Sequence, residues 1–226
     1  MGTGIFQKIR FITKSLCSVI YGKNEVCLLC ESPQEEGYIC ETCSMQIKVL
    51  NLQYDIENHG IKFPCCSLGV YSFNFKKLIL LLKYEKEFVA GEILASYLST
   101  FIEANLKEKI DMITFIPSSK TALKTRGFNQ CEILCKYVSE RCGIPYMPLM
   151  DKRSEGRDQI GLDTGKRWEN VKDSFQLKST VKIENKRILL IDDVVTSGAT
   201  SFHGEKCLKD GCAGEVYILT VAKSGV

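Results

Sequence analysis

No stretch of this 226-residue sequence approaches the ~18 apolar residues in a row that a membrane-spanning helix needs. Internal repeats and low-complexity tracts are also absent. The two signs of charge nearly balance, and a net charge of +3 argues neither for nor against a nucleic-acid partner. Hydrophobic residues make up 45% and charged residues 25%, which indicates an ordinary globular protein: one α/β domain and a small appendage.

Acidic side chains are missing from the chain before Glu25. Apolar residues at helical spacing alternate there with basic ones, which predicts a short basic amphipathic helix over residues 1–26. Lys14 interrupts the apolar core that a secretory signal requires, and Phe6 stands where a myristoylation signal needs a hydroxyl. We expect this helix either to pack on its own domain or to touch a membrane surface or nucleic acid.

Cysteine is abundant, with twelve residues. Several stand alone on apparent helix faces of a long chain, which indicates a reducing compartment rather than a secreted disulfide scaffold. Four others form two Cys-x-x-Cys knuckles whose spacing predicts a structural zinc site, with paired disulfides as the alternative. These four are Cys27, Cys30, Cys40 and Cys43. Cys65 and Cys66 are neighbours that rarely share one metal, so their role stays open.

The most informative stretch begins with four apolar residues, 188–191, typical of a strand buried on both faces. Asp192 and Asp193 follow, and we expect them at the carboxyl end of the strand, where open α/β sheets bind ligands. A loop of small and hydroxylated residues then leads into a helical pattern, so its N–H groups and the helix dipole would hold a phosphate. The loop residues are Thr196, Ser197, Gly198, Ala199 and Thr200. An ordinary Asp-rich turn is the alternative.

This stretch resembles the motif of type I phosphoribosyltransferases that binds 5-phosphoribosyl 1-diphosphate (PRPP). The resemblance implies that Asp192 and Asp193 hold the ribose hydroxyls, that the following loop holds the 5′-phosphate, and that Mg²⁺ accompanies PRPP. It also implies the fold class: α/β, with a mainly parallel phosphoribosyltransferase-like sheet and helices on both faces. A small N-terminal zinc lobe over residues 1–66 would precede a main domain over 67–226.

A second buried strand is expected over residues 111–117. It leads into Ser118, Ser119 and Lys120, which are candidates for a loop that binds the diphosphate. Residues 50–64 look like a linker, and residues 69–75 look like a strand. Apolar residues at helical spacing predict a helix over residues 90–106, and residues 216–221 look like a final buried strand.

The segment Arg126, Gly127, Phe128, Asn129 and Gln130 opens a further helix and narrows the resemblance. The chain resembles the ComF family in the order of three features. These are an N-terminal knuckle lobe, an RGFNQ segment after a strand that ends in proline, and a later LxDDVxTxGAT motif. The likeness runs from Cys27 to Ala222, although the usual His and Pro before RGFNQ are missing here. ComF proteins are bacterial and associated with natural competence, the import of single-stranded DNA into the cytoplasm.

Residues 151–173 are polar and match a basic segment of the family. They are expected to form either a lid that closes over PRPP or a solvated surface loop. The candidate lid residues are Arg153, Arg157, Gln159 and Arg167.

Three functions stay open on this basis. The first is a cytoplasmic competence factor, located at or near the inner face of the membrane, that binds PRPP and single-stranded DNA. Its basic contacts would be residues 8–23 and 152–167, and its partners a competence helicase or the membrane-surface uptake machinery. The second is an active phosphoribosyltransferase acting on a nitrogenous acceptor, and the third is a PRPP-sensing regulator without catalysis.

Overall fold

The computed structural model describes residues 26–58, 60–153 and 174–225. The chain divides into two compact units, Met1–Ile47 and Lys48–Val226. Within the first, the described part is a knuckle region with one short helix, α2 (Glu41–Met45). The helix expected over residues 1–26 falls almost wholly outside the described residues.

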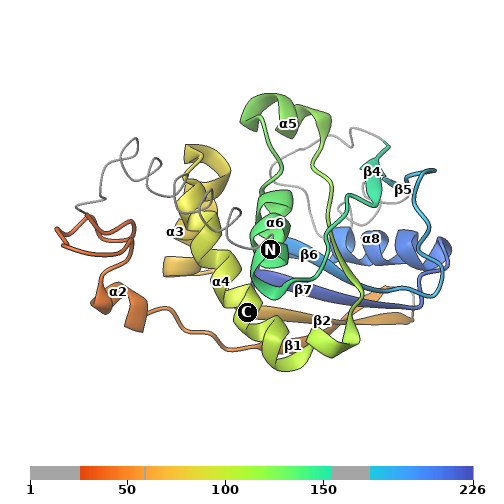
Figure 1. Cartoon of the computed structure of the whole chain (residues 1–226), viewed down its shortest axis with the longest axis horizontal. Coiled ribbons are helices and arrows are strands. Elements are labelled where there is room, and N and C mark those ends of the chain that lie inside the picture. The colour runs from red at the N-terminus through yellow and green to blue at the C-terminus, as the bar shows by residue number, and fades with distance from the viewer. Residues whose placement is uncertain (1–25, 59, 154–173, 226) are drawn as a thin grey trace, which may run out of the picture. The chain divides into compact units, whose positions relative to one another are not determined.

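The second unit is built on a five-stranded sheet with strand order β1-β2-β7-β6-β3 (Figure 1). Neighbours from β2 to β3 run parallel, and β1 pairs antiparallel with β2 at one edge. The mainly parallel sheet predicted from the sequence is therefore confirmed. The strands are β1 (Leu52–Asn58), β2 (Ile61–Val70), β3 (Met112–Phe115), β6 (Arg187–Val195) and β7 (Glu215–Lys223).

Helices cover both faces of this sheet, as expected. One face carries α8 (Ala199–Asp210), which packs on β6 and β7. The other carries α4 and α6, which pack on each other and on the strands. The elements of that second layer, with the short helices around it, are α3 (Phe73–Leu80), η1 (Leu81–Glu85), α4 (Phe88–Asn105), η2 (Lys107–Lys109), α5 (Lys120–Arg126) and α6 (Gln130–Cys142).

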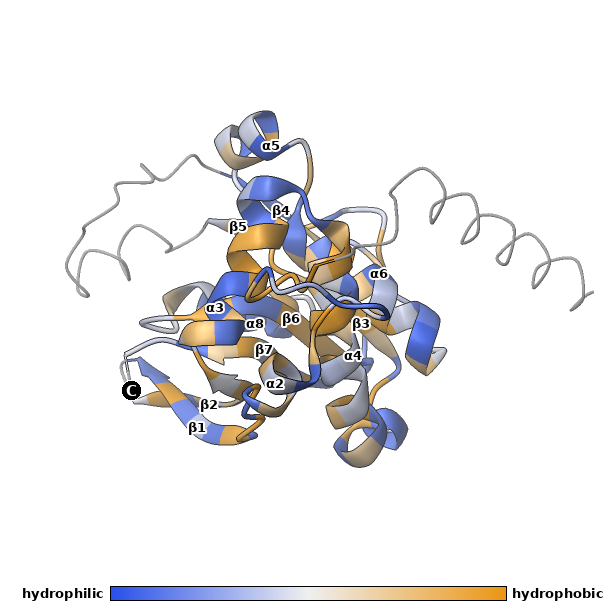
Figure 2. Ribbon diagram, turned by 90° about the vertical axis from the view of Figure 1, so that its left-hand side faces the viewer, coloured by the Kyte–Doolittle hydropathy of each residue, from blue (hydrophilic) through white to orange (hydrophobic). Residues whose placement is uncertain are grey.

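The core beneath α8 is apolar because strand residues alternate between the two faces. Ile188 and Leu190 of β6 pack with Phe202 and Leu208 of α8 in one buried cluster. Figure 2 shows hydrophobic residues gathered on the inner elements and hydrophilic ones on outlying helix α5. Among the described residues, every helix is too short or too polar to cross a bilayer.

Two sequence-based expectations were wrong. Residues 50–64 are no linker, because β1 and the start of β2 occupy most of them. Strand β1 does carry the alternation of a half-buried strand, because Leu52, Tyr54 and Ile56 alternate with polar residues, and the expectation of a linker overlooked it. The strand expected over residues 69–75 ends at Val70, and α3 begins at Phe73.

The helices predicted over the other strongly periodic segments are present as α4, α6 and α8. Helix α5 and a small antiparallel pair were not anticipated. The pair consists of β4 (Met150–Lys152) and β5 (Phe175–Leu177), which lie on either side of residues 154–173 in the chain.

Candidate functional site

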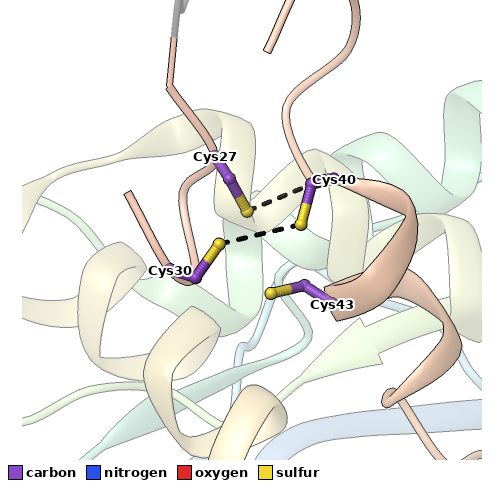
Figure 3. A group of neighbouring side chains, drawn as sticks. All are labelled: Cys27, Cys30, Cys40 and Cys43. Carbon is purple, nitrogen blue, oxygen red and sulfur yellow. Dashed lines mark hydrogen bonds between the residues drawn. The ribbon is translucent and has the colours of Figure 1, made fainter. Parts of the chain in front are cut away.

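Four cysteine thiols of the first unit gather around one point (Figure 3). One sulfur atom from each of Cys27, Cys30, Cys40 and Cys43 lies within 4.8 Å of the others. The backbone N–H groups of Leu29 and Cys40 donate to the Cys27 sulfur at 3.4 and 3.3 Å. The predicted knuckles are thus assembled, and the four thiols could hold a metal ion such as zinc.

The distances in this cluster suit a metal better than a disulfide. The sulfur atoms of Cys30 and Cys40 are 3.7 Å apart, whereas a disulfide bond spans about 2.05 Å. A tetrahedron with Zn–S bonds of about 2.3 Å has edges of about 3.8 Å. All described cysteines are free thiols, so the alternative of paired disulfides is not what the structure contains.

In the second unit, the two acids of the strand motif are buried in β6. Asp192 is 6% exposed and Asp193 is 5% exposed. The expectation that both lie at the carboxyl end of the strand needs correction, because β6 continues through Val195 and Asp192 is paired in register with Thr220 of β7. The apolar residues Val194 and Val195 extend the strand beyond the acids, so the acidic pair does not terminate it.

Asp192 is tied into its surroundings by one carboxylate oxygen. Its Oδ1 accepts from the backbone N–H of Asp193 at 2.9 Å and from the thiol of Cys131 on α6 at 3.4 Å. Burial raises the pKa of Asp192 to about 7, and the charge of Asp193 adds to this rise. Burial also raises the pKa of Cys131 well above its ordinary value, so this thiol keeps its proton and serves as the donor.

Asp193 forms an ion pair with Lys83 of η1. Both side chains are mostly buried, with 18% of Lys83 and 8% of Asp193 exposed. Burial alone would lower the pKa of Lys83, but the charge of Asp193 and the hydrogen bond to it, with smaller contributions from Cys131 and Asp192, together raise the pKa. One sign of this residue is visible in the sequence, where Lys83 is the single charge that follows five apolar residues, 78–82.

The phosphate loop predicted from the sequence leads from β6 into α8. Gly198 is the N-cap of α8 and has φ +82°, a conformation that favours glycine. A Cβ atom at this position would lie 2.5 Å from Cγ2 of Ile56, so β1 approaches the loop closely. Thr196 is exposed, while Ser197 and Thr200 are partly exposed. Ser197 Oγ accepts from the N–H of Ala199 at 3.4 Å, so the turn is closed by one of its own hydroxyls.

The candidate diphosphate loop follows β3, next to β6 in the sheet. Ile116 donates its N–H to the carbonyl of Ile191, immediately before Asp192, so the two strand ends are adjacent. Ser118 is partly exposed and Lys120 is exposed at the start of α5. Ser119 is buried, and its Oγ accepts from the N–H of Ala122 as the N-cap of α5.

The RGFNQ segment forms the corner between α5 and α6. Arg126 donates to Gln130 Oε1 at 3.0 Å, and Gly127 ends α5 with φ +85°. Phe128 packs against Phe88 with ring centroids 5.2 Å apart. Asn129 caps α6 by accepting from the N–H of Cys131. The cap holds Cys131 in the first turn of α6, where its thiol donates to Asp192.

Of the candidate lid residues, only Arg153 is described; Arg157, Gln159 and Arg167 lie outside the described residues. Arg153 donates its backbone N–H to Ser174 and its Nε to Gln176 Oε1 at 2.8 Å. It borders a groove of about 440 Å³ between β5 and α8. Neither Asp192 nor Asp193 lines that groove, so Arg153 and the acidic pair are not brought together in it.

No family model matches the chain. Competence protein ComFC of Streptococcus pneumoniae is 29% identical over 184 residues, which cover 81% of this chain and 74% of the relative. Competence protein ComFC of Bacillus subtilis is 25% identical over 227 residues, covering 96% and 85%. Among solved structures, the adenine phosphoribosyltransferase of Thermoanaerobacter pseudethanolicus covers 80% of this chain and 99% of its own, with 14% identity and a TM-score of 0.42, too low to bear on the site. Because the two curated relatives align with most of this chain, its resemblance to the ComF competence family is confirmed.

Proposed function

We propose that the chain binds PRPP together with Mg²⁺ and acts in the cytoplasm in the handling of single-stranded DNA during natural competence. One observation carries the proposal: an acidic pair on a central parallel strand is followed directly by a glycine-capped loop at the N-terminus of a twelve-residue helix. The competence role is inferred from the names of the two ComFC relatives.

The loop suits the 5′-phosphate of a sugar phosphate. The N-terminus of α8 offers backbone N–H groups and the positive end of the helix dipole. Exposed or partly exposed hydroxyls of Thr196, Ser197 and Thr200 surround it. A side chain at Gly198 would collide with Ile56. Glycine therefore allows β1 to pack against the loop and leaves no side chain over the backbone N–H groups.

The acidic pair suits the ribose hydroxyls and an oxygen-preferring cation. Asp192 and Asp193 each bring a carboxylate oxygen to within 4.8 Å of the other and of the Cys131 sulfur. Carboxylates are donors that Mg²⁺ prefers, whereas the Cys131 thiol stays protonated and is no ligand for it. When bound with PRPP, Mg²⁺ would neutralise charge on the diphosphate, and Asp192 and Asp193 would orient the ribose.

We also propose that the four clustered thiols hold a structural zinc ion. Four protein sulfurs leave no coordination position for a substrate, so the ion would stabilise the first unit rather than act in chemistry.

The nucleic-acid part of the proposal has support from one surface feature. Tyr84 is 64% exposed, and the guanidinium of Arg126 lies 5.2 Å from the centre of its ring. Phe88, 39% exposed, packs against Phe128, two residues after Arg126 in the chain. Exposed aromatic rings next to a guanidinium are surfaces on which unpaired bases stack. This feature favours single-stranded nucleic acid over a duplex, whose bases are already stacked.

Isothermal titration calorimetry with PRPP and Mg²⁺ tests the sugar-phosphate site. The double substitution Asp192→Asn and Asp193→Asn should abolish binding, because ribose hydroxyls lose charged acceptors that contribute ~1.5–3 kcal/mol each. Asp151→Asn, on β4, is the matched control and should bind as the wild type does. Equal affinities of the wild type and the double variant would place the sugar elsewhere. Pyrophosphate release, measured against a panel of bases, then separates a transferase from a sensor.

Single-stranded DNA binding is tested by fluorescence anisotropy at several salt concentrations. Tyr84→Ala should weaken binding by roughly tenfold or more, since stacking of a base on an aromatic ring contributes ~1–3 kcal/mol. Tyr38→Ala, at an exposed tyrosine of the first unit, is the control. Normal transformation of a naturally competent host that lacks the protein would refute the competence role.

A further inference from the structure

Lys83 lies on a π-helical turn. This turn, η1, follows α3 directly and ends at its C-cap residue Lys86, which has φ +58°. Single π-helical turns inside helical segments are frequent at functional sites. In this one, Lys83 forms the ion pair with Asp193, and its neighbour Tyr84 is exposed next to Arg126.

One ammonium group lies beside two buried acidic side chains. Asp193 is ion-paired with Lys83, whereas Asp192, whose pKa is raised by burial to about 7, is charged only in part near neutral pH, and the Cys131 thiol remains neutral. The donor atoms of Cys131, Asp192 and Asp193 lie within 4.8 Å of one another, a spacing that would suit a cation. An ammonium group from the chain itself already lies against one of these donors.

We propose that Lys83 is a built-in counter-ion that keeps divalent cations off Asp192 and Asp193 until PRPP is present. This inference rests on the proposed function, because it concerns how the same site is controlled. Lys83 neutralises Asp193 in the ligand-free protein, so a metal ion entering alone would have to displace a buried ion pair or sit beside its positive charge.

PRPP changes this balance because it carries several negative charges. Lys83 can then release Asp193 to the ribose and keep an anionic partner in the diphosphate, so its charge is not left uncompensated. The lysine stem is flexible and its ammonium is a compact point charge, which suits such an exchange. Metal binding at the acidic pair therefore becomes conditional on the sugar phosphate.

The competing view is that Lys83 and Asp193 are a structural ion pair only. Both views predict that Lys83→Met destabilises the fold, because removal of one partner leaves a buried charge. Only the counter-ion role predicts a gain: loss of the ammonium opens the acidic pair to a metal ion in the absence of PRPP. The decisive measurement is therefore metal affinity and not stability.

The experiment uses Mn²⁺ as a paramagnetic probe, with the full chain and no PRPP present. Free Mn²⁺ is counted by electron paramagnetic resonance. The wild type and Lys76→Met, an exposed lysine of α3, should bind weakly and equally. Lys83→Met should bind at least tenfold more tightly, Lys83→Arg should behave as the wild type, and Lys83→Met with Asp193→Asn should lose the gain. If Lys83→Met does not fold by circular dichroism, Lys83→Gln, whose amide can donate to Asp193, takes its place.

Equal Mn²⁺ affinities of the wild type and the folded Lys83 variant would overturn the proposal, as would tight Mn²⁺ binding by the wild type. In a second titration PRPP is added to the wild type with Mn²⁺, and binding of both to the protein is expected. If PRPP does not bind, the proposed PRPP site is refuted, while the Mn²⁺ comparison without PRPP still decides the role of Lys83.

Discussion

Asn129 ties the loop after β3 to the first turn of α6. Its Nδ2 donates to the carbonyl of Ile116 at 2.9 Å, and its Oδ1 accepts from the N–H of Cys131 at the same distance. One buried side chain therefore fixes both the strand end next to Asp192 and the thiol that donates to Asp192.

Substitutions of Asn129 should separate these two roles. Asn129→Ser keeps an N-cap oxygen but loses the amide donor, so it leaves the buried Ile116 carbonyl without its partner, at a cost of ~1–3 kcal/mol. Asn129→Ala loses the cap as well, which adds ~0.5–2 kcal/mol. Urea denaturation measures both, and the expected order of stability is wild type, Asn129→Ser, Asn129→Ala. Equal stability of the two variants would mean that the cap contributes nothing.

Gly198→Ala tests the close approach of β1 to the phosphate loop. The structure offers a matched control, because Gly127 has nearly the same positive φ but no atom within 4 Å of a built Cβ. Both substitutions cost ~1 kcal/mol or more in backbone strain. Only Gly198→Ala adds a collision with Ile56. We expect it to be the more destabilising in thermal melts and to weaken PRPP binding, whereas Gly127→Ala should leave binding intact.

Cys40→Ser should release the metal that we propose for the knuckle cluster. Elemental analysis of protein prepared reduced and without chelators should give about one zinc per chain in the wild type and in Cys212→Ser, an exposed cysteine outside the cluster. Cys40→Ser should lose it, and limited proteolysis should then cut first within residues 26–47 while the second unit stays folded. Absence of zinc from the wild type would contradict the metal assignment.

The burial of Glu205 should make the free energy of unfolding depend on pH. This α8 residue is 2% exposed, and its Oε2 lacks a hydrogen-bond partner among the described residues. Burial raises the pKa of Glu205 to about 8 from an ordinary value of 4.5. The unfolded chain therefore releases this proton at lower pH than the folded protein does. The stability present below pH ~4.5 is lost progressively as the pH rises to ~8, by a few kcal/mol at most.

Glu205→Gln should remove this loss, because the amide does not ionise. Denaturation in urea between pH 5 and 8 should show a flatter stability curve for Glu205→Gln than for the wild type. Glu140→Gln, an exposed position on α6, should keep the wild-type slope. An unchanged slope in Glu205→Gln would mean that Glu205 ionises normally in the folded protein.

The sequence predicted the elements that have a regular apolar pattern. It did not predict contacts between residues far apart in the chain. The apolar runs predicted β3, β6 and β7, and helical spacing predicted α4, because burial on a regular element leaves a period. Adjacent acids and a hydroxyl loop predicted the candidate PRPP site, which stays a prediction. The partner of Asp193 left no such pattern, because Lys83 lies on an irregular π-helical turn far away in the sequence.

The error over residues 50–64 has a different cause. Leu52, Tyr54 and Ile56 do alternate with polar residues, but the pattern is short and Ile56 is the single residue of β1 that is buried. The role of RGFNQ was also hidden, because Asn129 acts through a backbone carbonyl, which every residue has.

The position of β7 has a consequence for the newly made chain. Of the five strands of this sheet it is the last to be synthesised, yet it lies in the middle of the sheet, between β2 and β6. Until it inserts, β1 and β2 have no contact with β6 through the sheet, so Ile56 cannot be brought against Gly198 and the phosphate loop lacks one wall. A chain that has not yet added β7 would therefore expose unpaired edges on β2 and β6 and lack the wall that Ile56 gives to the proposed phosphate loop.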